Sequence, residues 1–582
     1  MRVLQGIPIA PGYGHGQAVP YRRTELLFAA ARNAVADDSR TELRRVEAAR
    51  RAARRELDAL ARSLKEHYGL DEGHIFHAQL LMLDDDLFSG LIRDQLAKGR
   101  SAEAAVVDAV REIESMFKRQ VDPYLRERAL DVHDVGARVL AHLIDKCSHP
   151  FARLPSAAVI VADELLPSDT VFLDRGRVRA LVTAHGSENS HAAILARALG
   201  IPAVTGVREI LDACTPGDAI AVDGETGRVI LHIEGQAQAD YLHHARRYGL
   251  ALNEARRMTG QSIDTLDGVE ITLLANVDRV EDIDVAVERH AAGIGLLRTE
   301  FLYMAEGDGD PEERQEAIYR HAARCFADRP ITIRIIDLAP DKIVSLAGDV
   351  PHVGAALSEC GIHYALAHPA ILRPQLRAIL RAAREANIRI LLPGVVGLPE
   401  IDAFRALLED VAAELQRETG SASPSVPVGA MIETPAALLM ADAIAARADF
   451  LSLGTNDLLC HLFGRERRRG KETAYEPSFL RALELTVRAA EAAHKPLSIC
   501  GEIAGTPAFT ALLIGLGIRE LSMSPERLPE VRYSISKISA DAARALARRA
   551  LGLHVAGEVQ RLLSEHVDPW HALLGGGEAT SV

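Results

Sequence analysis

Short apolar runs alternate with long helix-compatible stretches through the second half of the chain. About eight such runs occur within roughly 300 residues, at positions 271–277, 293–297, 331–336, 388–392, 428–432, 450–453, 497–499 and 520–523. The segments between them carry apolar residues at helical spacing. This alternation over this length is typical of a (β/α)8 barrel. We therefore predict a barrel over residues 261–565.

Polar side chains follow several of these runs, at the points where the strands should end. They are Arg298, Thr299 and Glu300 after the second run, Asp337 after the third, Glu433 after the fifth, Asn456 and Asp457 after the sixth, and Cys500 and Glu502 after the seventh. The carboxyl ends of barrel strands converge on one face, which is where active sites lie. A polar residue after one strand would mean little, but polar residues after several strands of one barrel predict a shared active site.

The first 233 residues carry a different pattern. Residues 1–20 and 147–233 are rich in strand-like segments with Gly and Pro turns, whereas residues 21–146 are almost entirely helix-compatible. This organisation predicts a helical subdomain inserted into an α/β domain. Residues 234–260 are charged and helix-prone, which predicts a linker helix, and residues 566–582 are expected to form a tail.

A short polar loop in the predicted α/β domain carries a candidate nucleophile. The apolar run at 180–184 predicts a strand, residues 186–190 read GSENS, and a helix-compatible segment begins at His191. Unpaired N–H groups and the helix dipole at a helix start stabilise anions such as a phosphoryl group. His191 can therefore carry phosphate on a ring nitrogen, and the alternative is a helix-capping turn with an incidental histidine.

The composition agrees with a multidomain cytoplasmic enzyme. The chain has 582 residues and a formal net charge of −14, which argues against a general nucleic-acid binder because such a protein needs a basic face. No uncharged apolar run of about 18 residues and no signal-peptide core occur, so we expect no membrane span. The six cysteines are scattered, which predicts reduced thiols and no disulfide frame or structural zinc.

Motifs along nearly the whole chain resemble one known family. They are residues 6–12 (GIPIAPG), 295–304 (GLLRTEFLYM), 373–382 (RPQLRAILRA), 432–437 (IETPAA), 454–458 (GTNDL) and 500–505 (CGEIAG). Together they resemble Enzyme I of the phosphoenolpyruvate (PEP)-dependent sugar phosphotransferase system. A related dikinase is disfavoured, because only about 230 residues precede the linker and no nucleotide-binding glycine loop is evident.

The resemblance implies both the architecture and the reaction. The expected fold is a swivelling phosphohistidine α/β domain with an inserted helical subdomain, a linker helix and a PEP-binding barrel. The phosphoryl group of PEP would pass to His191 and then to a small histidine phosphocarrier protein (HPr-like) that docks on the helical subdomain, releasing pyruvate. Cys500 is placed like the family's general acid. The resemblance also implies a homodimer formed through the barrel and a role in sugar transport.

The charge of PEP and the resemblance together suggest the binding residues. PEP brings several negative charges, and arginines supply forked donors that match phosphate and carboxylate. The candidates are Arg298, Arg334 and Arg467, with Asn456 as a neutral donor. The resemblance selects Arg467 within its arginine-rich segment. Glu433 and Asp457 are the expected protein ligands of Mg²⁺, which prefers oxygen.

The chain departs from the family pattern near the expected substrate. Cys360 and His363 stand where the family has arginines, and Glu188 places a carboxylate where a cation is expected. A like charge beside a phosphoryl group is unfavourable. Two alternatives to a divergent but active Enzyme I therefore stay open. One is a related Mg²⁺-dependent phosphotransferase with an altered donor or acceptor, and the other is a non-catalytic regulatory paralogue that binds carrier protein.

Overall fold

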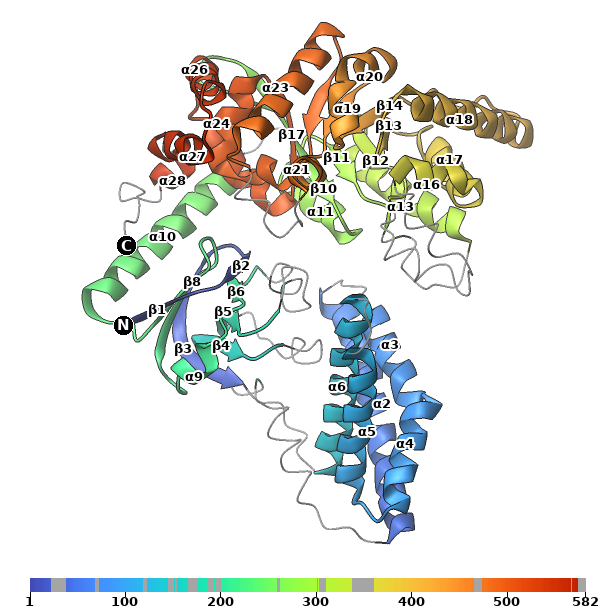
Figure 1. The fold of residues 1–582 in the computed structure, drawn as a ribbon, viewed down its shortest axis with the longest axis vertical. Coiled ribbons are helices and arrows are strands. Elements are labelled where there is room, and N and C mark those ends of the chain that lie inside the picture. Colours follow the sequence, from blue (N-terminus) through green and yellow to red (C-terminus); the bar gives the residue numbers. More distant parts are fainter. Residues whose placement is uncertain are drawn as a thin grey trace. The chain divides into compact units, whose positions relative to one another are not determined.

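The computed structural model describes the chain as two compact units, Met1–Tyr248 and Gly249–Val582, each with its own sheet (Figure 1). The described residues are 1–21, 38–68, 73–118, 123–144, 151, 154–165, 176–186, 193, 196, 200–258, 262–300, 302, 310–337, 361–464, 474–566 and 568–573.

The first unit is built on an eight-stranded sheet in the order β1-β8-β7-β3-β4-β5-β6-β2. Its strands are β1 (Arg2–Gln5), β2 (Ile7–Ala10), β3 (Tyr13–Tyr21), β4 (Ala158–Ala162), β5 (Val178–Thr183), β6 (Ala203–Thr205), β7 (Ala219–Asp223) and β8 (Arg228–Leu231). The strands from β3 to β6 are parallel, and the other pairs are antiparallel. On β4, Ile160 belongs to one buried apolar cluster and Val159 and Val161 to another. This period of two shows that the sheet is covered on both faces.

A helical bundle lies between β3 and β4 in the chain. It contains α2 (Ser39–Tyr68), α3 (Gly73–Asp84), α4 (Asp86–Ala97), α5 (Ala102–Lys118) and α6 (Pro123–Leu143). On α5, residues at helical spacing form a fully buried stripe: Ala102, Ala105, Val106, Ala109 and Val110. Because α5 packs against α4 and α6, this stripe forms the centre of the bundle.

A long helix, α10 (Gly235–Arg257), follows the short helix α9 (Ile210–Ala213) and the last two strands of the first unit. The hydroxyl oxygen of Tyr241 lies 2.9 Å from the carbonyl oxygen of Gly14 and 2.7 Å from that of Val222. The ring of Tyr13 packs edge-on against Tyr241 and Tyr248. These contacts hold the first turns of α10 along β3 and β7.

The second unit is a closed barrel of eight parallel strands. They are β10 (Glu270–Val277), β11 (Ile294–Leu297), β12 (Ile331–Arg334), β13 (Ile388–Leu392), β14 (Val428–Ile432), β15 (Leu451–Leu453), β16 (Leu497–Ile499) and β17 (Glu520–Met523). Pairing of β10 with both β17 and β11 closes the barrel, and β9 (Ser262–Asp264) adds an antiparallel edge to β10. The strands form where the apolar runs predicted them, which confirms the predicted fold class.

Helices alternate with the barrel strands and continue after the last one. They are α11 (Glu281–Glu288), α13 (Pro311–Phe326), α16 (Gly361–Ala367), α17 (Pro369–Ala382), α18 (Leu398–Thr419), α19 (Pro435–Leu439), α20 (Ala441–Arg447), α21 (Thr455–Phe463), α23 (Pro477–Ala492), α24 (Pro507–Leu516), α25 (Leu528–Ile535), α26 (Ala540–Leu551), α27 (Ala556–Glu565) and α28 (Pro569–Leu573), with 3₁₀ turns η3 (Glu502–Gly505) and η4 (Pro525–Arg527).

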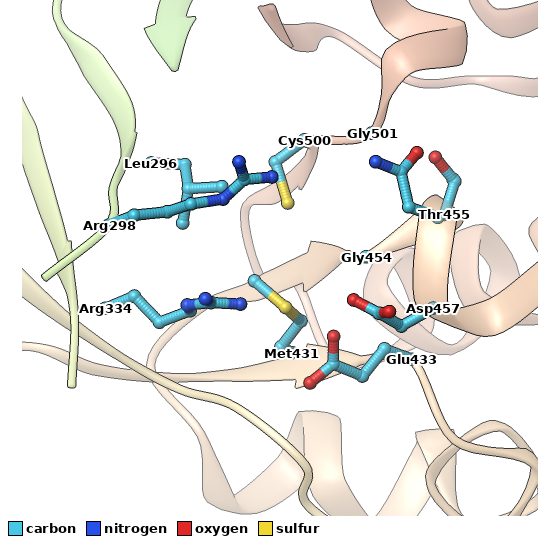
Figure 2. A pocket seen from close by; sticks show the side chains of 11 residues that line it. Leu296, Arg298, Arg334, Met431, Glu433, Gly454, Thr455, Asp457, Cys500 and Gly501 are labelled. Atoms are coloured by element: carbon cyan, nitrogen blue, oxygen red, sulfur yellow. The ribbon is translucent and has the colours of Figure 1, made fainter. Parts of the chain in front are cut away.

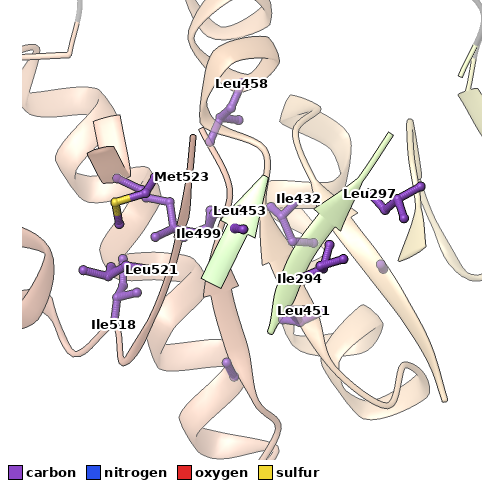
Figure 3. Packing of buried hydrophobic residues seen from close by; sticks show 14 of the residues in the cluster. Ile294, Leu297, Ile432, Leu451, Leu453, Leu458, Ile499, Ile518, Leu521 and Met523 are labelled. Atoms are coloured by element: carbon purple, nitrogen blue, oxygen red, sulfur yellow. The ribbon is translucent and has the colours of Figure 1, made fainter. Parts of the chain in front are cut away.

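Strand residues of the barrel alternate between two apolar clusters. Ile432, Leu451 and Leu453 belong to the large cluster that the strands form with the surrounding helices, part of which is drawn in Figure 3. Met431 and Cys500 belong to a second, smaller cluster together with Leu296, Leu391 and Phe450. Since side chains alternate across a strand, the second cluster fills the barrel interior. Cys500 is therefore placed at the end of a strand and inside the barrel.

The packed structure continues beyond residue 565, where we expected the tail. Trp570 on α28 is only 2% exposed, and its ring centre lies 5.9 Å from that of Tyr533 on α25. A large aromatic surface removed from water holds this short helix in place. In the part of the chain that the structure describes, no helix has both the length and the apolar character needed to cross a membrane.

Candidate active site

A pocket opens at the carboxyl ends of the barrel strands. It is lined by Leu296, Arg298, Arg334, Met431, Glu433, Gly454, Thr455, Asn456, Asp457, Cys500 and Gly501. These residues come from the ends of β11, β12, β14 and β16 and from the first turn of α21. Figure 2 shows Arg298 and Arg334 extending into the pocket from one side, with Glu433 and Asp457 facing them from the other.

Arg334 is held rigidly by carboxylates. Its Nη2 donates to Oε1 of Glu300 over 2.7 Å, and its Nη1 lies 2.9 Å from Oδ2 of Asp337. Burial alone would lower the pKa of Arg334, but the surrounding carboxylates outweigh burial and raise it. Arg334 is therefore a fixed cation at the wall of the pocket. Arg298, which is more exposed, donates to Oδ1 of Asp278 over 2.8 Å.

The opposite wall carries a carboxylate that is only partly satisfied. Glu433 is 4% exposed, and its Oε1 accepts a hydrogen bond of 2.6 Å from the N–H of Gly394. Its Oε2 is buried without a hydrogen-bond partner among the described residues. Burial, together with repulsion from Asp337 and Asp457, raises the pKa of Glu433 from 4.5 to about 8. At neutral pH the Glu433 carboxyl is therefore ionised only when a cation compensates its charge.

These carboxylates fit a hard divalent cation. Mg²⁺ prefers oxygen ligands, takes one or two carboxylates from the protein and binds substrate phosphate oxygens with the rest of its shell. Glu433 offers a buried oxygen, and Asp457 is the nearby second carboxylate. A Cβ on Gly454 would lie 2.9 Å from both Cβ and Oε2 of Glu433, and a Cβ on Gly501 would overlap Oγ1 of Thr455. The two glycines therefore keep space for a ligand beside these oxygens.

Two neutral groups complete the pocket. The N–H of Glu502 donates to Oδ1 of Asn456 over 3.0 Å, which fixes the amide and leaves its NH₂ group as a donor. Oγ1 of Thr455 is buried and has no partner within the described part of the chain. Both groups can bind a phosphate or carboxylate oxygen of a small anion.

Cys500 is a buried thiol with a serine beside it. Oγ of Ser452 donates to Sγ of Cys500 over 3.3 Å, and Oγ of Ser498 donates to Oγ of Ser452 over 3.1 Å. Burial raises the pKa of Cys500 to about 11, although the hydrogen bond from Ser452 acts in the opposite direction. The thiol is therefore protonated at neutral pH and can donate a proton to an atom in the pocket.

The structure brings together most of the residues that the sequence singled out for chemistry. Those in the pocket are Arg298, Arg334, Glu433, Asn456, Asp457 and Cys500. His191, Arg467, Glu188 and Cys360 lie outside the described residues. His363, which stands where the family has an arginine, pairs with Glu400 at 3.3 Å.

Sequence reasoning missed three contributions to the site. Glu300 and Asp337 were noted as strand-end residues, but not as partners of Arg334. Glu300 reaches Arg334 because β11 and β12 are neighbours in the barrel, whereas Asp337 follows Arg334 by three residues in the chain. Thr455 was noted in the polar segment after the sixth run, but it was given no role beside Asn456 and Asp457. Ser452 was also missed, although a single polar residue within an apolar strand is a signal that could have identified it.

Three models of PEP-utilising enzymes match the chain in succession. The model described as "PEP-utilising enzyme, N-terminal" matches residues 5–128, the mobile-domain model matches residues 154–227, and the PEP-binding-domain model matches residues 253–540. The range matched by the PEP-binding-domain model includes every residue that lines the pocket.

Relatives named phosphoenolpyruvate-protein phosphotransferase match the chain over nearly its whole length. The protein from Geobacillus stearothermophilus is 33% identical over 563 residues, which cover 96% of this chain and 97% of the relative. The protein from Haloferax volcanii is 36% identical over 97% of this chain and 99% of its own. The Staphylococcus aureus protein is 31% identical over 97% of this chain and 100% of its own.

Proposed function

This chain belongs to the phosphoenolpyruvate-protein phosphotransferase family, and on that premise we propose that it uses PEP to phosphorylate a protein. The phosphoryl group passes first to His191 and then to a histidine of a small HPr-like phosphocarrier protein, and pyruvate is released. The observation that carries the proposal is the pocket at the barrel's carboxyl face. It sets arginine cations against the buried Glu433 and the half-buried Asp457, and it includes a protonated thiol.

PEP binding is assigned to the cationic wall. Arg298 and Arg334 each present a guanidinium group to the pocket, and such groups match both the phosphate and the carboxylate of PEP. The ion pairs of Arg334 with Glu300 and Asp337 keep that cation oriented before substrate arrives. Asn456 adds a neutral donor, and Arg467 is proposed as a further cation from the resemblance to the family.

Glu433 and Asp457 are the proposed ligands of Mg²⁺. When bound, Mg²⁺ neutralises the charge that develops on phosphoryl and enolate oxygens. The buried Oε2 of Glu433 would gain the partner that it lacks among the described residues. The carboxylate wall would also become less repulsive toward PEP, which is itself an anion.

Cys500 is the proposed acid that completes pyruvate formation. Transfer of the phosphoryl group breaks the bond between phosphorus and the enol oxygen and forms a bond to an imidazole nitrogen of His191. The enolate that remains must gain a proton on its methylene carbon to become pyruvate. The thiol of Cys500 supplies this proton and becomes a thiolate, which the hydroxyl of Ser452 stabilises by its hydrogen bond.

The remaining roles rest on the family. The helical bundle from α2 to α6 is proposed to dock the carrier protein, and the strand-rich part of the first unit, with β4 to β6, is proposed to carry the phosphohistidine. The proposed docking subdomain spans residues 21–146, and the proposed phosphohistidine domain spans residues 1–20 and 147–233. We further propose a homodimer through the barrel, a cytoplasmic location and a place in sugar uptake.

Radiolabelled PEP tests the proposal. In the presence of Mg²⁺ we expect acid-labile phosphate on His191, and its transfer to an added HPr-like carrier. His191→Ala should remove the label, whereas the matched variant His185→Ala should keep it, because His185 is an exposed histidine of the same polar segment. Label on another residue, or full phosphotransfer by His191→Ala, would overturn the proposal.

A further inference from the structure

Three potential metal ligands lie together on the helical layer of the barrel, apart from the pocket described above. They are Asp284 on α11 and His321 and Cys325 on α13, two helices that pack against each other (Figure 1). Nε2 of His321 lies 3.3 Å from Oδ1 of Asp284 and 3.9 Å from Sγ of Cys325. The third distance, between Sγ of Cys325 and Oδ1 of Asp284, is 3.9 Å.

This triangle has nearly the dimensions of a tetrahedral zinc site. With the usual Zn–S, Zn–N and Zn–O bond lengths, tetrahedral angles place the nitrogen and oxygen ligands about 3.3 Å apart. The same geometry places sulfur about 3.6 Å from either of them. The observed distances of 3.3, 3.9 and 3.9 Å differ from these by a few tenths of an ångström. Small rotamer adjustments would close that difference.

We propose that Asp284, His321 and Cys325 form a binding site for Zn²⁺ or a similar borderline divalent ion, with water as the fourth ligand. Imidazole and thiolate favour such ions over Mg²⁺, which prefers an all-oxygen shell. The site is therefore chemically distinct from the carboxylate pair of the pocket. Asp284 is 67% exposed at its side chain, so a solvent molecule can reach the fourth position.

The helices hold these ligands in place before any ion binds. His321 and Cys325 are four residues apart on α13, so their side chains share one face of the helix. On α11, Ile283 and Ala286 are buried in the barrel core beside Asp284. Tyr319, Ala322 and Phe326 anchor α13 in the same core. An ion bound here would connect α11 to α13 and stabilise the folded second unit.

Binding should also release a proton. A cysteine thiol ordinarily carries its proton at neutral pH in the absence of metal. A thiol must lose its proton to ligate a metal ion. Calorimetry in buffers of different ionisation enthalpy would detect this proton, and Cys325→Ser would not release it.

Cobalt spectroscopy of the full-length protein tests the site directly. Co²⁺ substitutes for Zn²⁺ and gives a thiolate charge-transfer band only when sulfur is a ligand. Excess Mg²⁺ is kept present so that hard oxygen sites are filled. We expect one equivalent of Co²⁺ to produce this band, Zn²⁺ to displace it, and Cys325→Ser to abolish it. His321→Gln and Asp284→Asn should weaken binding at least about tenfold.

Glu281→Gln is the matched control, since Glu281 lies on α11 but does not belong to the cluster. It should bind Co²⁺ as the unchanged protein does. Zn²⁺ should raise the unfolding temperature of the wild type and of this control but not that of Cys325→Ser, and the fluorescence of Trp570 verifies that each variant is folded. Absence of the band in the wild type, or its persistence in Cys325→Ser, would overturn the proposal. PEP turnover in Mg²⁺ is measured separately, so the two proposals fail independently.

Discussion

Cys500 is subject to two opposing influences inside the barrel. Burial favours the neutral thiol and raises its pKa to about 11, while the hydrogen bond donated by Ser452 favours the thiolate. A general acid must be protonated before the reaction and must also release its proton during it. The serine makes release less costly without bringing the pKa into the neutral range.

Replacing Ser452 by alanine should therefore raise the pKa of Cys500 further. A hydrogen bond to a charged group is worth about 1.5–3 kcal/mol, which corresponds to roughly one to two pKa units. At alkaline pH below the wild-type pKa, the thiolate fraction and hence the rate of alkylation of Cys500 should fall roughly ten- to hundredfold. Mass spectrometry of the peptide that contains Cys500 measures this rate. Pyruvate formation should slow in parallel.

Ser522→Ala provides the comparison for this prediction. Ser522 is a fully buried serine on β17, and its hydroxyl donates to Oδ1 of Asn276 over 2.6 Å rather than to the thiol. Loss of the Ser522 hydroxyl should leave the pKa of Cys500, and hence its rate of alkylation, unchanged. If both serine variants lower the alkylation rate of Cys500 equally, the effect comes from loosened packing and the specific role of Ser452 is refuted.

The raised pKa of Glu433 predicts how magnesium binding depends on pH. The carboxyl has a pKa of about 8 in the metal-free fold and an ordinary value of 4.5, so it is largely protonated below 8. Because Mg²⁺ needs the carboxylate, its affinity should rise with pH up to about 8, by at most about tenfold per unit, and then level off. Calorimetric titration with Mg²⁺ across this range measures the slope.

The same shift has a consequence for the stability of the metal-free protein. Between pH 4.5 and about 8 the folded state binds more protons at Glu433 than the unfolded state does, so stability should decline as the pH rises through this window. In Glu433→Gln both the decline due to this group and the pH-dependent part of the magnesium affinity should be absent. An affinity that does not change with pH in the wild type would show that Glu433 is not a ligand.

At the scale of elements, close helix contacts limit which residues are tolerated. Gly515 lies near the end of α24, where α24 packs on α26. A Cβ at this position would overlap the backbone carbonyl of Ala543 and approach the N atom of Arg544 to 3.0 Å. Backbone atoms cannot rotate away as a side chain can, so the helices would have to separate.

Gly515→Ala should therefore lower the free energy of unfolding of the second unit by about 1–3 kcal/mol. Trp570 is the single tryptophan of the chain and is buried in this unit, so its fluorescence reports unfolding of this unit in denaturant. Gly557→Ala on α27 is the control, because a Cβ there meets no atom within 4 Å. It should be neutral or stabilising by up to about 1 kcal/mol. Equal effects of the two substitutions would contradict the packing argument.

The barrel strands could be predicted from the sequence because each is a short apolar run bounded by polar residues. The largest difference lies at β12, which we expected to reach Ile336 but which ends at Arg334. There the chain turns so that Asp337 can pair with Arg334, although the N–H of Ile335 still donates to the carbonyl of Leu391 over 3.1 Å. This ion pair joins residues three positions apart, and the apolar run alone does not reveal that the strand ends there to form it.

The residues of the candidate site were partly predictable from the barrel fold. The pocket residues could be collected from the sequence because the barrel brings all strand ends to one face. The buried oxygen of Glu433 and the serine beside Cys500 depend on which strands are neighbours and which side chains face inward. The Asp284, His321 and Cys325 cluster was missed because its ligands come from two helices and the carboxylate and the thiol are 41 positions apart in the chain.

At the scale of the whole molecule, the proposed reaction divides its chemistry between two compact units. PEP and Mg²⁺ are handled by residues of Gly249–Val582, whereas His191 and the proposed carrier-docking bundle belong to Met1–Tyr248. Phosphate exchange between His191 and a carrier histidine transfers a phosphoryl group between two imidazoles. It makes no use of the PEP pocket, so the two half-reactions can be disabled separately.

Glu433→Gln should separate them. We expect phosphorylation of His191 from PEP to slow by roughly a hundredfold to a thousandfold, because metal stabilisation of the transition state is worth several kcal/mol. Labelled phospho-carrier of the HPr type should still phosphorylate His191 in this variant at the wild-type rate. His191→Ala should accept phosphate from neither donor. Phosphorylation of Glu433→Gln from PEP at the normal rate would remove Glu433 from the active site, and failure of the carrier to label it would contradict the proposed division between the units.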